Sequence, residues 1–413
     1  MASLPGEVFS ITITSQYQIK VQIVGKVLIS EEMGERMMET SRNMDHLTKL
    51  YVEITTACNL DCQMCVRRAW REPIGSMTLK TFSALITQLR QLPLLPVIHL
   101  GGYGEPMWHP DFLEMVRLAK AAGAQVGVTT NGTLLDADTS AALMELGLDR
   151  LVVSIDGVTP ESYGDIRTNG SLEQVVENLR TLYRLKLRRA GKHSNPQVGI
   201  AFVAMKRNVA DLSRLPRLAT RIGAWTIQVS NLIPHTPEME SEILYNRSLT
   251  SCAFRASRWV ADMSLPKLDL DSHTLEPLGQ LSISTASLSL LDASLSARND
   301  YCRFTQQGYA AVRWDGQVSP CLSLLHDHPM YLHGRRKDVT HLALGNVNDR
   351  LLPDLWESRK FAQFRAKLRR FPFSPCTTCG GCERFPRNRI DCADNTFPTC
   401  GGCLWAQGFV QCP

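Results

Sequence analysis

Short hydrophobic runs alternate with longer amphipathic segments between about residue 50 and residue 235. Each run is rich in β-branched residues and is followed by a turn, then by apolar residues at helical spacing. The predicted strands are 50–55, 96–100, 124–130, 150–156, 197–204 and 225–232. The clearest helical patterns between them are 111–123, 138–147 and 171–185. These helices begin near Ser, Thr or Asp, and several end at glycine.

Repeated strand–helix units predict a parallel sheet that is covered by helices. Six units are too few for a closed eight-stranded barrel. We therefore expect an α/β fold, a partial (β/α)6 TIM-like barrel, with functional residues at the carboxyl ends of its strands.

The pattern divides the chain into four parts. Residues 1–48 are expected to form a hairpin followed by a helix, and residues 49–235 the barrel. Residues 236–300 are interpreted as a connector with some helix, because 281–296 is rich in Ser and Leu. Residues 301–413 are dense in Cys, Gly and Pro, which predicts a small domain held together by metal.

Composition narrows the possible partners. The net charge of +5 on 413 residues is too small to indicate nucleic-acid binding. No apolar run is long enough for a bilayer, and the N-terminus has no secretory signal pattern. We therefore expect a cytoplasmic protein without membrane or nucleic-acid partners. The basic stretches 184–193 and 359–370 are interpreted as solvated helix faces; the alternative is a dock for an acidic electron donor.

Thirteen cysteines in such a protein favour metal binding or catalysis over disulfides. Three of them, Cys58, Cys62 and Cys65, lie in "CNLDCQMC" directly after the first predicted strand. Three thiolates on a tight loop can hold three corners of a [4Fe–4S] cluster and leave the fourth iron free for another ligand. The alternatives are a zinc site completed by a distant residue, or structural cysteines.

"CNLDCQMC" resembles the CxxxCxxC signature of radical SAM enzymes, and further motifs of that family follow at the ends of successive predicted strands. They are "GGYGEP" (101–106), "TTNG" (129–132) and "SIDG" (154–157), with an arginine in "YGDIRTNG". Each motif alone is weak evidence for the family, because such sequences also occur in ordinary turns. Their order along the strand pattern is what makes the resemblance specific.

The resemblance implies a role for each matching residue. It implies that Cys58, Cys62 and Cys65 are the cluster ligands. Backbone groups shaped by Gly101, Gly102, Gly104 and Glu105 would receive the amino group of S-adenosylmethionine. Polar contacts to this cofactor would come from Asn131, Ser154, Asp156 and Arg167. In the family, the cluster passes one electron to S-adenosylmethionine, and the resulting 5′-deoxyadenosyl radical removes a hydrogen atom from a substrate. This chemistry implies a low-potential electron donor such as ferredoxin or flavodoxin.

The tail resembles the SPASM extension of radical SAM proteins, which binds one or two auxiliary [4Fe–4S] clusters. The implied ligands are Cys302, Cys321, Cys376, Cys379, Cys382, Cys392, Cys400, Cys403 and Cys412. The alternative is one or two zinc ribbons. The match is incomplete, because only one cysteine precedes the predicted hairpin 308–321. Cys252 is interpreted as a buried apolar residue, and His326 and His328 are expected to face solvent.

Residues 58–77 and 397–413 resemble a subgroup of maturases for tungsten-cofactor oxidoreductases. That resemblance implies a protein, peptide or pterin-cofactor substrate. The first alternative is a peptide-modifying enzyme that forms a thioether or a carbon–carbon crosslink. Formylglycine formation is disfavoured, because Leu322 occupies the position where sulfatase-maturing relatives place an aspartate. The second alternative is a non-catalytic iron–sulfur electron carrier.

Overall fold

The computed structural model describes most of the chain after residue 45. The described residues are 46–189, 195–246, 274, 276–277, 302–377, 382–410 and 412, together with the backbone of strands 6–13, 19–27 and 287–290. Two compact units result, residues 1–46 and residues 47–413. In the first unit, strands β1 (Gly6–Ile13) and β2 (Ile19–Val27) pair antiparallel. The helix expected after them lies outside the described residues.

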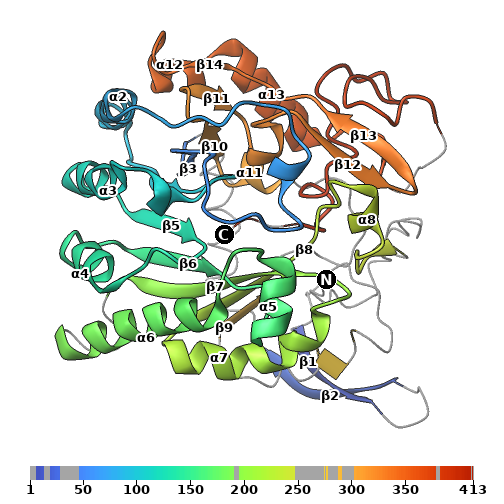
Figure 1. Cartoon of the computed structure of the whole chain (residues 1–413). Coiled ribbons are helices and arrows are strands. Elements are labelled where there is room, and N and C mark those ends of the chain that lie inside the picture. Colours follow the sequence, from blue (N-terminus) through green and yellow to red (C-terminus); the bar gives the residue numbers. More distant parts are fainter. Residues whose placement is uncertain are drawn as a thin grey trace. The chain divides into compact units, whose positions relative to one another are not determined.

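The second unit is built on a ten-stranded sheet with the order β14-β11-β10-β3-β4-β5-β6-β7-β8-β9 (Figure 1). Its centre consists of the six predicted strands, which are parallel and adjacent in chain order. They are β3 (Lys49–Val52), β4 (Val97–Leu100), β5 (Val126–Thr130), β6 (Arg150–Ser154), β7 (Gln197–Ala204) and β8 (Thr226–Asn231). This arrangement confirms the partial α/β barrel.

Helices connect these strands and cover the sheet (Figure 1). They are α2 (Leu79–Leu89), α3 (Phe112–Ala121), α4 (Ala137–Glu145), α5 (Pro160–Ile166), α6 (Leu172–Arg189), α7 (Leu215–Ile222) and α8 (Pro237–Glu240). Short 3-10 helices η1 (Val66–Arg68), η2 (Pro106–Trp108) and η3 (Val209–Arg214) lie in the loops. Side chains of Thr78, Asp136 and Thr159 cap helix starts, as the sequence predicts.

The two edges of the barrel sheet are extended by later parts of the chain. On one side, β10 (Tyr309–Val312) pairs parallel with β3, and β11 (Gln317–Ser319) and β14 (Gly345–Asn346) follow it. On the other side, β9 (Ser287–Leu290) pairs parallel with β8. The segment interpreted as a connector with some helix thus contains the short helix α8 (Pro237–Glu240) and, at 287–290, a strand in which Ser and Leu alternate.

The C-terminal part packs onto the barrel through the same hydrophobic core, since buried residues of both belong to one cluster. Its remaining elements are α11 (Arg303–Gln306), η4 (Leu322–Leu324), β12 (His328–Leu332), β13 (Arg335–Val339), α12 (Leu352–Trp356) and α13 (Arg359–Arg370). In the described part of the chain, no helix is long and apolar enough to cross a membrane.

A buried glutamine joins the barrel to the C-terminal part. Gln88 on α2 donates from Nε2 to the carbonyl oxygen of Val347 and accepts from the backbone N–H of Leu352, each at 2.9 Å. The Gln88→Ala variant should lose about 1–3 kcal/mol of unfolding free energy, because two buried backbone groups lose their partner. Denaturant unfolding measures the effect. The exposed Gln91→Ala is the matched control, and an equal loss in both variants would contradict this role.

Candidate active site

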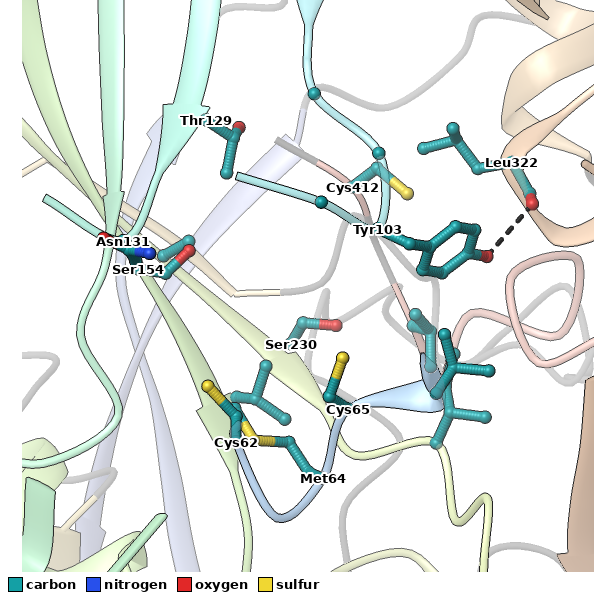
Figure 2. A pocket seen from close by; sticks show the side chains of 18 of the residues that line it. Cys62, Met64, Cys65, Tyr103, Thr129, Asn131, Ser154, Ser230, Leu322 and Cys412 are labelled. Carbon is teal, nitrogen blue, oxygen red and sulfur yellow. Dashed lines mark hydrogen bonds between the residues drawn. The ribbon is translucent and has the colours of Figure 1, made fainter. Parts of the chain in front are cut away.

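A cavity of about 330 Å³ opens at the carboxyl ends of the barrel strands. Ten of the eleven residues predicted to bind the first cluster and its cofactor line it. They are Cys58, Cys62, Cys65, Gly101, Gly102, Gly104, Glu105, Asn131, Ser154 and Arg167. Figure 2 shows Cys62 and Cys65 on one wall, with Asn131 and Ser154 at neighbouring strand ends. The fold thus gathers residues that are up to 109 positions apart, from Cys58 to Arg167.

The three-cysteine loop is held by backbone contacts rather than by regular structure. Arg67 donates to the carbonyl oxygens of Leu60 (2.8 Å) and Thr56 (3.3 Å), which fixes the loop from inside. Burial raises the pKa of Cys62 to about 11, and the nearby Arg167 only partly offsets this. The thiols must lose their protons to bind iron, so loading a metal cluster here releases protons.

The glycine loop after β4 packs against the cysteine loop so closely that side chains do not fit. A Cβ on Gly104 would lie 2.1 Å from the carbonyl oxygen of Thr55, and one on Gly102 would lie 2.7 Å from Glu53 Oε2. The backbone of this loop therefore borders the cavity directly, as a cofactor that binds to main-chain groups requires.

Glu105 fixes the glycine loop to the end of β5 and does not extend into the cavity as a free carboxylate. Its oxygens accept from Thr130 Oγ1 (2.7 Å), the Asn131 N–H (2.7 Å) and the Met107 N–H (3.1 Å). Burial raises the pKa of Glu105, and these hydrogen bonds oppose that shift. Asn131 in turn donates to Asn59 Oδ1 at 2.8 Å, so both cavity loops are tied together.

Asp156 is the predicted site residue that does not line the cavity. Its Oδ1 accepts from the Val203 N–H at 2.7 Å, and its Oδ2 accepts from Arg167 Nε at 2.8 Å and pairs with Arg167 Nη2 at 2.6 Å. Burial disfavours the charge of Arg167, but Asp156 outweighs it and raises the pKa of Arg167. The pair places a permanently charged guanidinium at the cavity wall, with Nη1 4.0 Å from Cys62 Sγ.

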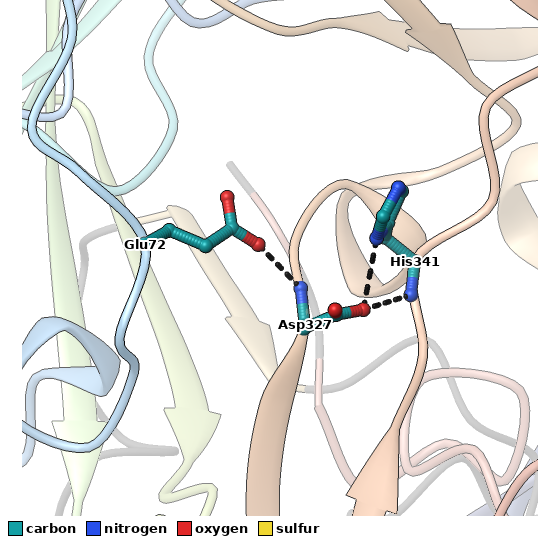
Figure 3. A group of neighbouring side chains, drawn as sticks. All are labelled: Glu72, Asp327 and His341. Atoms are coloured by element: carbon teal, nitrogen blue, oxygen red, sulfur yellow. Dashed lines mark hydrogen bonds and ion pairs between the residues drawn. The ribbon is translucent and has the colours of Figure 1, made fainter.

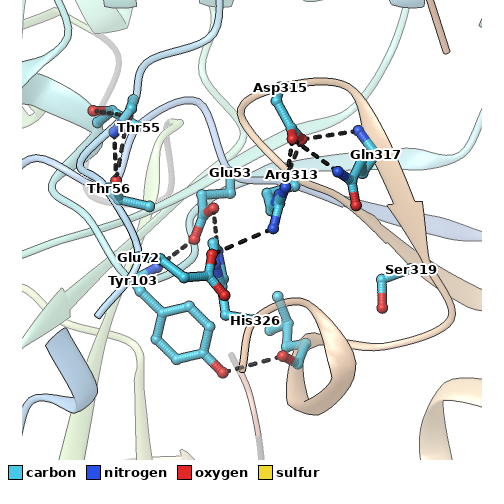
Figure 4. A network of polar contacts seen from close by, with 12 residues as sticks. Glu53, Thr55, Thr56, Glu72, Tyr103, Arg313, Asp315, Gln317, Ser319 and His326 are labelled. Carbon is cyan, nitrogen blue, oxygen red and sulfur yellow. Dashed lines mark hydrogen bonds and ion pairs between the residues drawn. The ribbon is translucent and has the colours of Figure 1, made fainter. Parts of the chain in front are cut away.

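Behind the glycine loop lies a buried polar network that the sequence analysis missed (Figure 4). Glu53, which follows β3, accepts from the Tyr103 N–H (3.1 Å) and from His326 Nε2 (2.7 Å). His326 Nδ1 contacts Glu72 at 2.7 Å, and Glu72 also pairs with Arg313 at 3.3 Å. The network links the first barrel strand, the glycine loop and the C-terminal part.

The expectation that His326 and His328 face solvent is wrong. They are only 1% and 4% exposed, because the loop after η4 folds back onto the barrel. Burial disfavours a charged His326 ring, but its hydrogen bonds to Glu53 and Glu72 outweigh this and raise its pKa to about 9. His328 has no such carboxylate contact, and burial lowers its pKa to about 4.

Glu72, Asp327 and His341 place potential ligand atoms within 4.8 Å of one another (Figure 3). These atoms already have partners in the protein. Glu72 Oε1 accepts from the Asp327 N–H at 2.9 Å, and Asp327 Oδ1 accepts from both the N–H and Nδ1 of His341. The group is explained by these hydrogen bonds, and we assign it no ion.

The tail cysteines fall into two groups. Four thiols, of Cys302, Cys321, Cys400 and Cys403, line one small internal cavity. Cys376 feels the charges of Cys382 and Cys392 and also borders the turn from Cys400 to Cys403, while Cys379 and the isolated Cys252 lie outside the described residues. Cys412 joins neither cavity group: it lines the main cavity, with its Sγ 3.0 Å from Trp405 Nε1, and lies beside Tyr103 in Figure 2.

Local sequence patterns do point to some of the site residues that were not predicted. Glu53 directly follows a buried strand and alternates with Tyr51 and Thr55, which places an acidic residue in a buried stretch of the chain. Arg67 follows the cysteine motif by two positions, as an arginine among loop residues. The position of Cys412 in the main cavity has no comparable local signal, because it depends on the path of the whole tail.

Two family profiles match this sequence. The radical SAM superfamily profile matches residues 52–198, and the SPASM iron–sulfur cluster-binding domain profile matches residues 302–383.

Two curated relatives illustrate the similarity. The "tungsten-containing aldehyde ferredoxin oxidoreductase cofactor-modifying protein" of Pyrococcus furiosus is 33% identical over 373 residues, which are 88% of this chain and 96% of the relative. Mycofactocin maturase MftC of Mycobacterium tuberculosis is 32% identical over 193 residues, which are 47% of this chain and 46% of the relative.

Solved structures share the fold at low sequence identity. The structure of anSMEcpe with bound AdoMet has a TM-score of 0.57 and 18% identity, and the match covers 88% of this chain and 92% of that one. Streptococcus suis SuiB bound to its precursor peptide SuiA has a TM-score of 0.54 and 13% identity, with coverage of 88% and 78%. At these identities the similarity concerns the fold alone.

The raised pKa of His326 predicts a pH-dependent stability. Because its folded-state value of about 9 exceeds the ordinary 6.5, its contribution is complete below pH 6.5 and is lost as the pH rises through 9. The unfolding free energy should therefore fall by about 1–3 kcal/mol over that range. In His326→Gln this slope should be missing. Denaturant unfolding between pH 6 and 9.5 tests it, with the exposed His46→Gln as control; the same slope in H326Q would assign it to another group.

Proposed function

This chain belongs to the radical SAM superfamily and carries a SPASM iron–sulfur domain, and we propose that it cleaves S-adenosylmethionine to a 5′-deoxyadenosyl radical that removes a hydrogen atom from its substrate. The observation that carries the proposal is the composition of one cavity. Three thiols from a single loop share it with a glycine loop that has no room for side chains and with the strand ends at Asn131 and Ser154.

The residues around the cavity fit a cluster that bears S-adenosylmethionine. Cys58, Cys62 and Cys65 would hold three irons, and the bound cluster would supply the electron that breaks a carbon–sulfur bond of S-adenosylmethionine. The glycine loop offers main-chain groups to the amino group. Arg167, held in place by Asp156, offers a fixed positive charge to a carboxylate.

The described lining of the cavity holds no free carboxylate. Among the described residues that line it, Glu105 is the only carboxylate, and its oxygens are taken by backbone and hydroxyl donors. Leu322, next to the hairpin cysteine, lines the cavity with an apolar side chain and accepts from Tyr103 Oη through its carbonyl oxygen at 3.1 Å. At this position the chain has no carboxylate that could act as a base in forming formylglycine.

We propose two auxiliary [4Fe–4S] clusters in the tail. Cys302, Cys321, Cys400 and Cys403 would hold one of them, and Cys376, Cys379, Cys382 and Cys392 the other. These eight thiols complete two ligand sets, which leaves Cys412 in the wall of the main cavity as a residue that faces the substrate region. A low-potential donor such as ferredoxin or flavodoxin would supply the electrons.

For the substrate, we propose a tungsten-cofactor oxidoreductase or its pterin cofactor. The support is the similarity to the Pyrococcus furiosus cofactor-modifying protein, which extends over 88% of this chain and includes both the barrel and the tail. Adding the tungsten–pterin cofactor, or the oxidoreductase that carries it, should increase the rate of S-adenosylmethionine cleavage. An increase only with a peptide substrate would favour the peptide-modifying alternative.

Replacing Cys62 should abolish the chemistry and leave the tail intact. The anaerobically reconstituted chain with dithionite and S-adenosylmethionine should release 5′-deoxyadenosine, and Cys62→Ala should release at least 100-fold less (~2.7 kcal/mol or more in barrier terms), because one cluster ligand is lost. Chromatography measures the product, and electron paramagnetic resonance should still detect the tail clusters. Product formation by the variant would refute the ligand assignment, and absence of product from the unmodified chain would favour an electron carrier.

The iron count separates the roles of the tail cysteines. The reconstituted chain should hold about twelve irons, as expected for three [4Fe–4S] clusters. Cys412→Ala should keep all of them, because the two proposed ligand sets are complete without Cys412, whereas Cys400→Ala should lose up to about four. Iron and sulfide analysis gives the result. A loss of about four irons in C412A would make Cys412 a ligand after all.

A further inference from the structure

A buried lysine occupies an unusual place in the C-terminal part. Strand β13 alternates between exposed and buried positions, with Arg336 and Asp338 outside and Lys337 and Val339 inside. Lys337 is only 2% exposed, and its ammonium lies 5.3 Å from the centre of the Phe385 ring. Lysine is rarely buried to this extent unless a partner compensates its charge.

The ammonium of Lys337 lies against the turn from Cys400 to Cys403, and Cys376 of the second group borders the same place. A Cβ on Gly402, inside the turn from Cys400 to Cys403, would lie 2.2 Å from Lys337 Nζ and 3.4 Å from Cys376 Cβ. Gly402 therefore leaves the space that the ammonium fills. Lys337 also lines the small cavity formed by the first cysteine group.

The charged groups that act on this lysine come from both cysteine groups. They are the thiols of Cys376 and Cys382 on one side and of Cys400 and Cys403 on the other. Burial lowers the pKa of Lys337, and all four thiols oppose this by raising it. Thiolates bound to iron carry the negative charge that a buried ammonium needs. Metal-bound thiols at this place would therefore explain why a lysine can be buried beside them.

We propose that Lys337 is a cation shared by the two auxiliary clusters, which stabilises the reduced form of each and raises both midpoint potentials. The inference rests on the proposed assignment of the tail thiols to two clusters. A [4Fe–4S] cluster with four thiolates changes its net charge from −2 to −3 when it takes up one electron. In a buried site, a fixed positive charge nearby favours the more negative state. The electron comes from the low-potential donor, and no proton is transferred.

A cation that both clusters share affects the midpoint potentials of both. A cation next to one cluster alone would create a difference in potential between the two. A cation shared by both raises the two potentials in the same direction. Lys337 is therefore a positioning residue for charge, which touches neither S-adenosylmethionine nor the substrate: it lies outside the lining of the main cavity.

The test is a redox titration followed by electron paramagnetic resonance on the reconstituted full chain. Lys337→Met keeps a long apolar side chain and removes the charge, and both auxiliary midpoint potentials should become more negative. Lys337→Arg restores a positive charge and should move them back toward the original values. Lys360→Met on the exposed surface of α13 is the matched control and should leave both potentials unchanged, since solvent screens its charge.

The iron content separates this inference from its premise. About twelve irons in both the original chain and K337M show that all clusters are loaded, so a shift in potential reports the charge. Unchanged potentials in fully loaded K337M, or a shift of one cluster only, would overturn the shared-cation role. If K337M loses iron, Lys337→Gln, which keeps a polar group of similar length, is titrated instead. Its two auxiliary midpoint potentials should also become more negative, and unchanged potentials or a shift of only one would again overturn the role. A chain with only about four irons at the barrel would refute the auxiliary clusters and the role of Lys337 together.

Discussion

The architecture of the site depends on one buried carboxylate at the end of the first barrel strand. Glu53 is 1% exposed and contacts both the glycine loop, through the Tyr103 N–H, and the C-terminal part, through His326. A buried carboxylate has to be fully hydrogen-bonded, so its partners cannot move independently of it. The loop that borders the cofactor region and the domain that carries the tail cysteines are thereby held in one fixed relation.

These contacts of Glu53 hold the C-terminal part in place as one wall of the main cavity. β10 pairs directly with β3, and Leu322, Trp405 and Cys412 line the cavity opposite the cofactor motifs. A substrate would therefore contact both parts of the chain. Differences in the tail could therefore change the substrate without altering the strand ends.

Charge is arranged differently at the two kinds of cysteine site. At the barrel, Asp156 pairs with Arg167 and holds the charged guanidinium in one orientation at the cavity wall. In the tail, Lys337 acts on thiols from two groups at once. The first arrangement suits recognition of a cofactor carboxylate, and the second suits control of cluster charge.

The sequence by itself determined the barrel and the residues that meet at its strand ends, the three cysteines of 58–65 among them, because both are encoded locally. Strand and helix periodicity fixes the six parallel strands, and the motifs lie next to strand ends that a parallel sheet must bring together. Only the tertiary structure decided how the later segments pair. That β10 joins β3 and that 287–290 is a strand depend on partners more than 50 residues away.

Long-range packing also decided the environment of single side chains. His326 follows a loop pattern typical of exposed residues, yet two glutamates from the barrel bury and charge it. Asp156 matches a cofactor motif, yet it supports Arg167 from behind the cavity wall. Cys412 is one of nine tail cysteines by sequence and a cavity residue by position. Spacing along the chain specifies which chemistry is available, whereas burial and charge pairing, which arise only when distant segments meet, specify what each residue does.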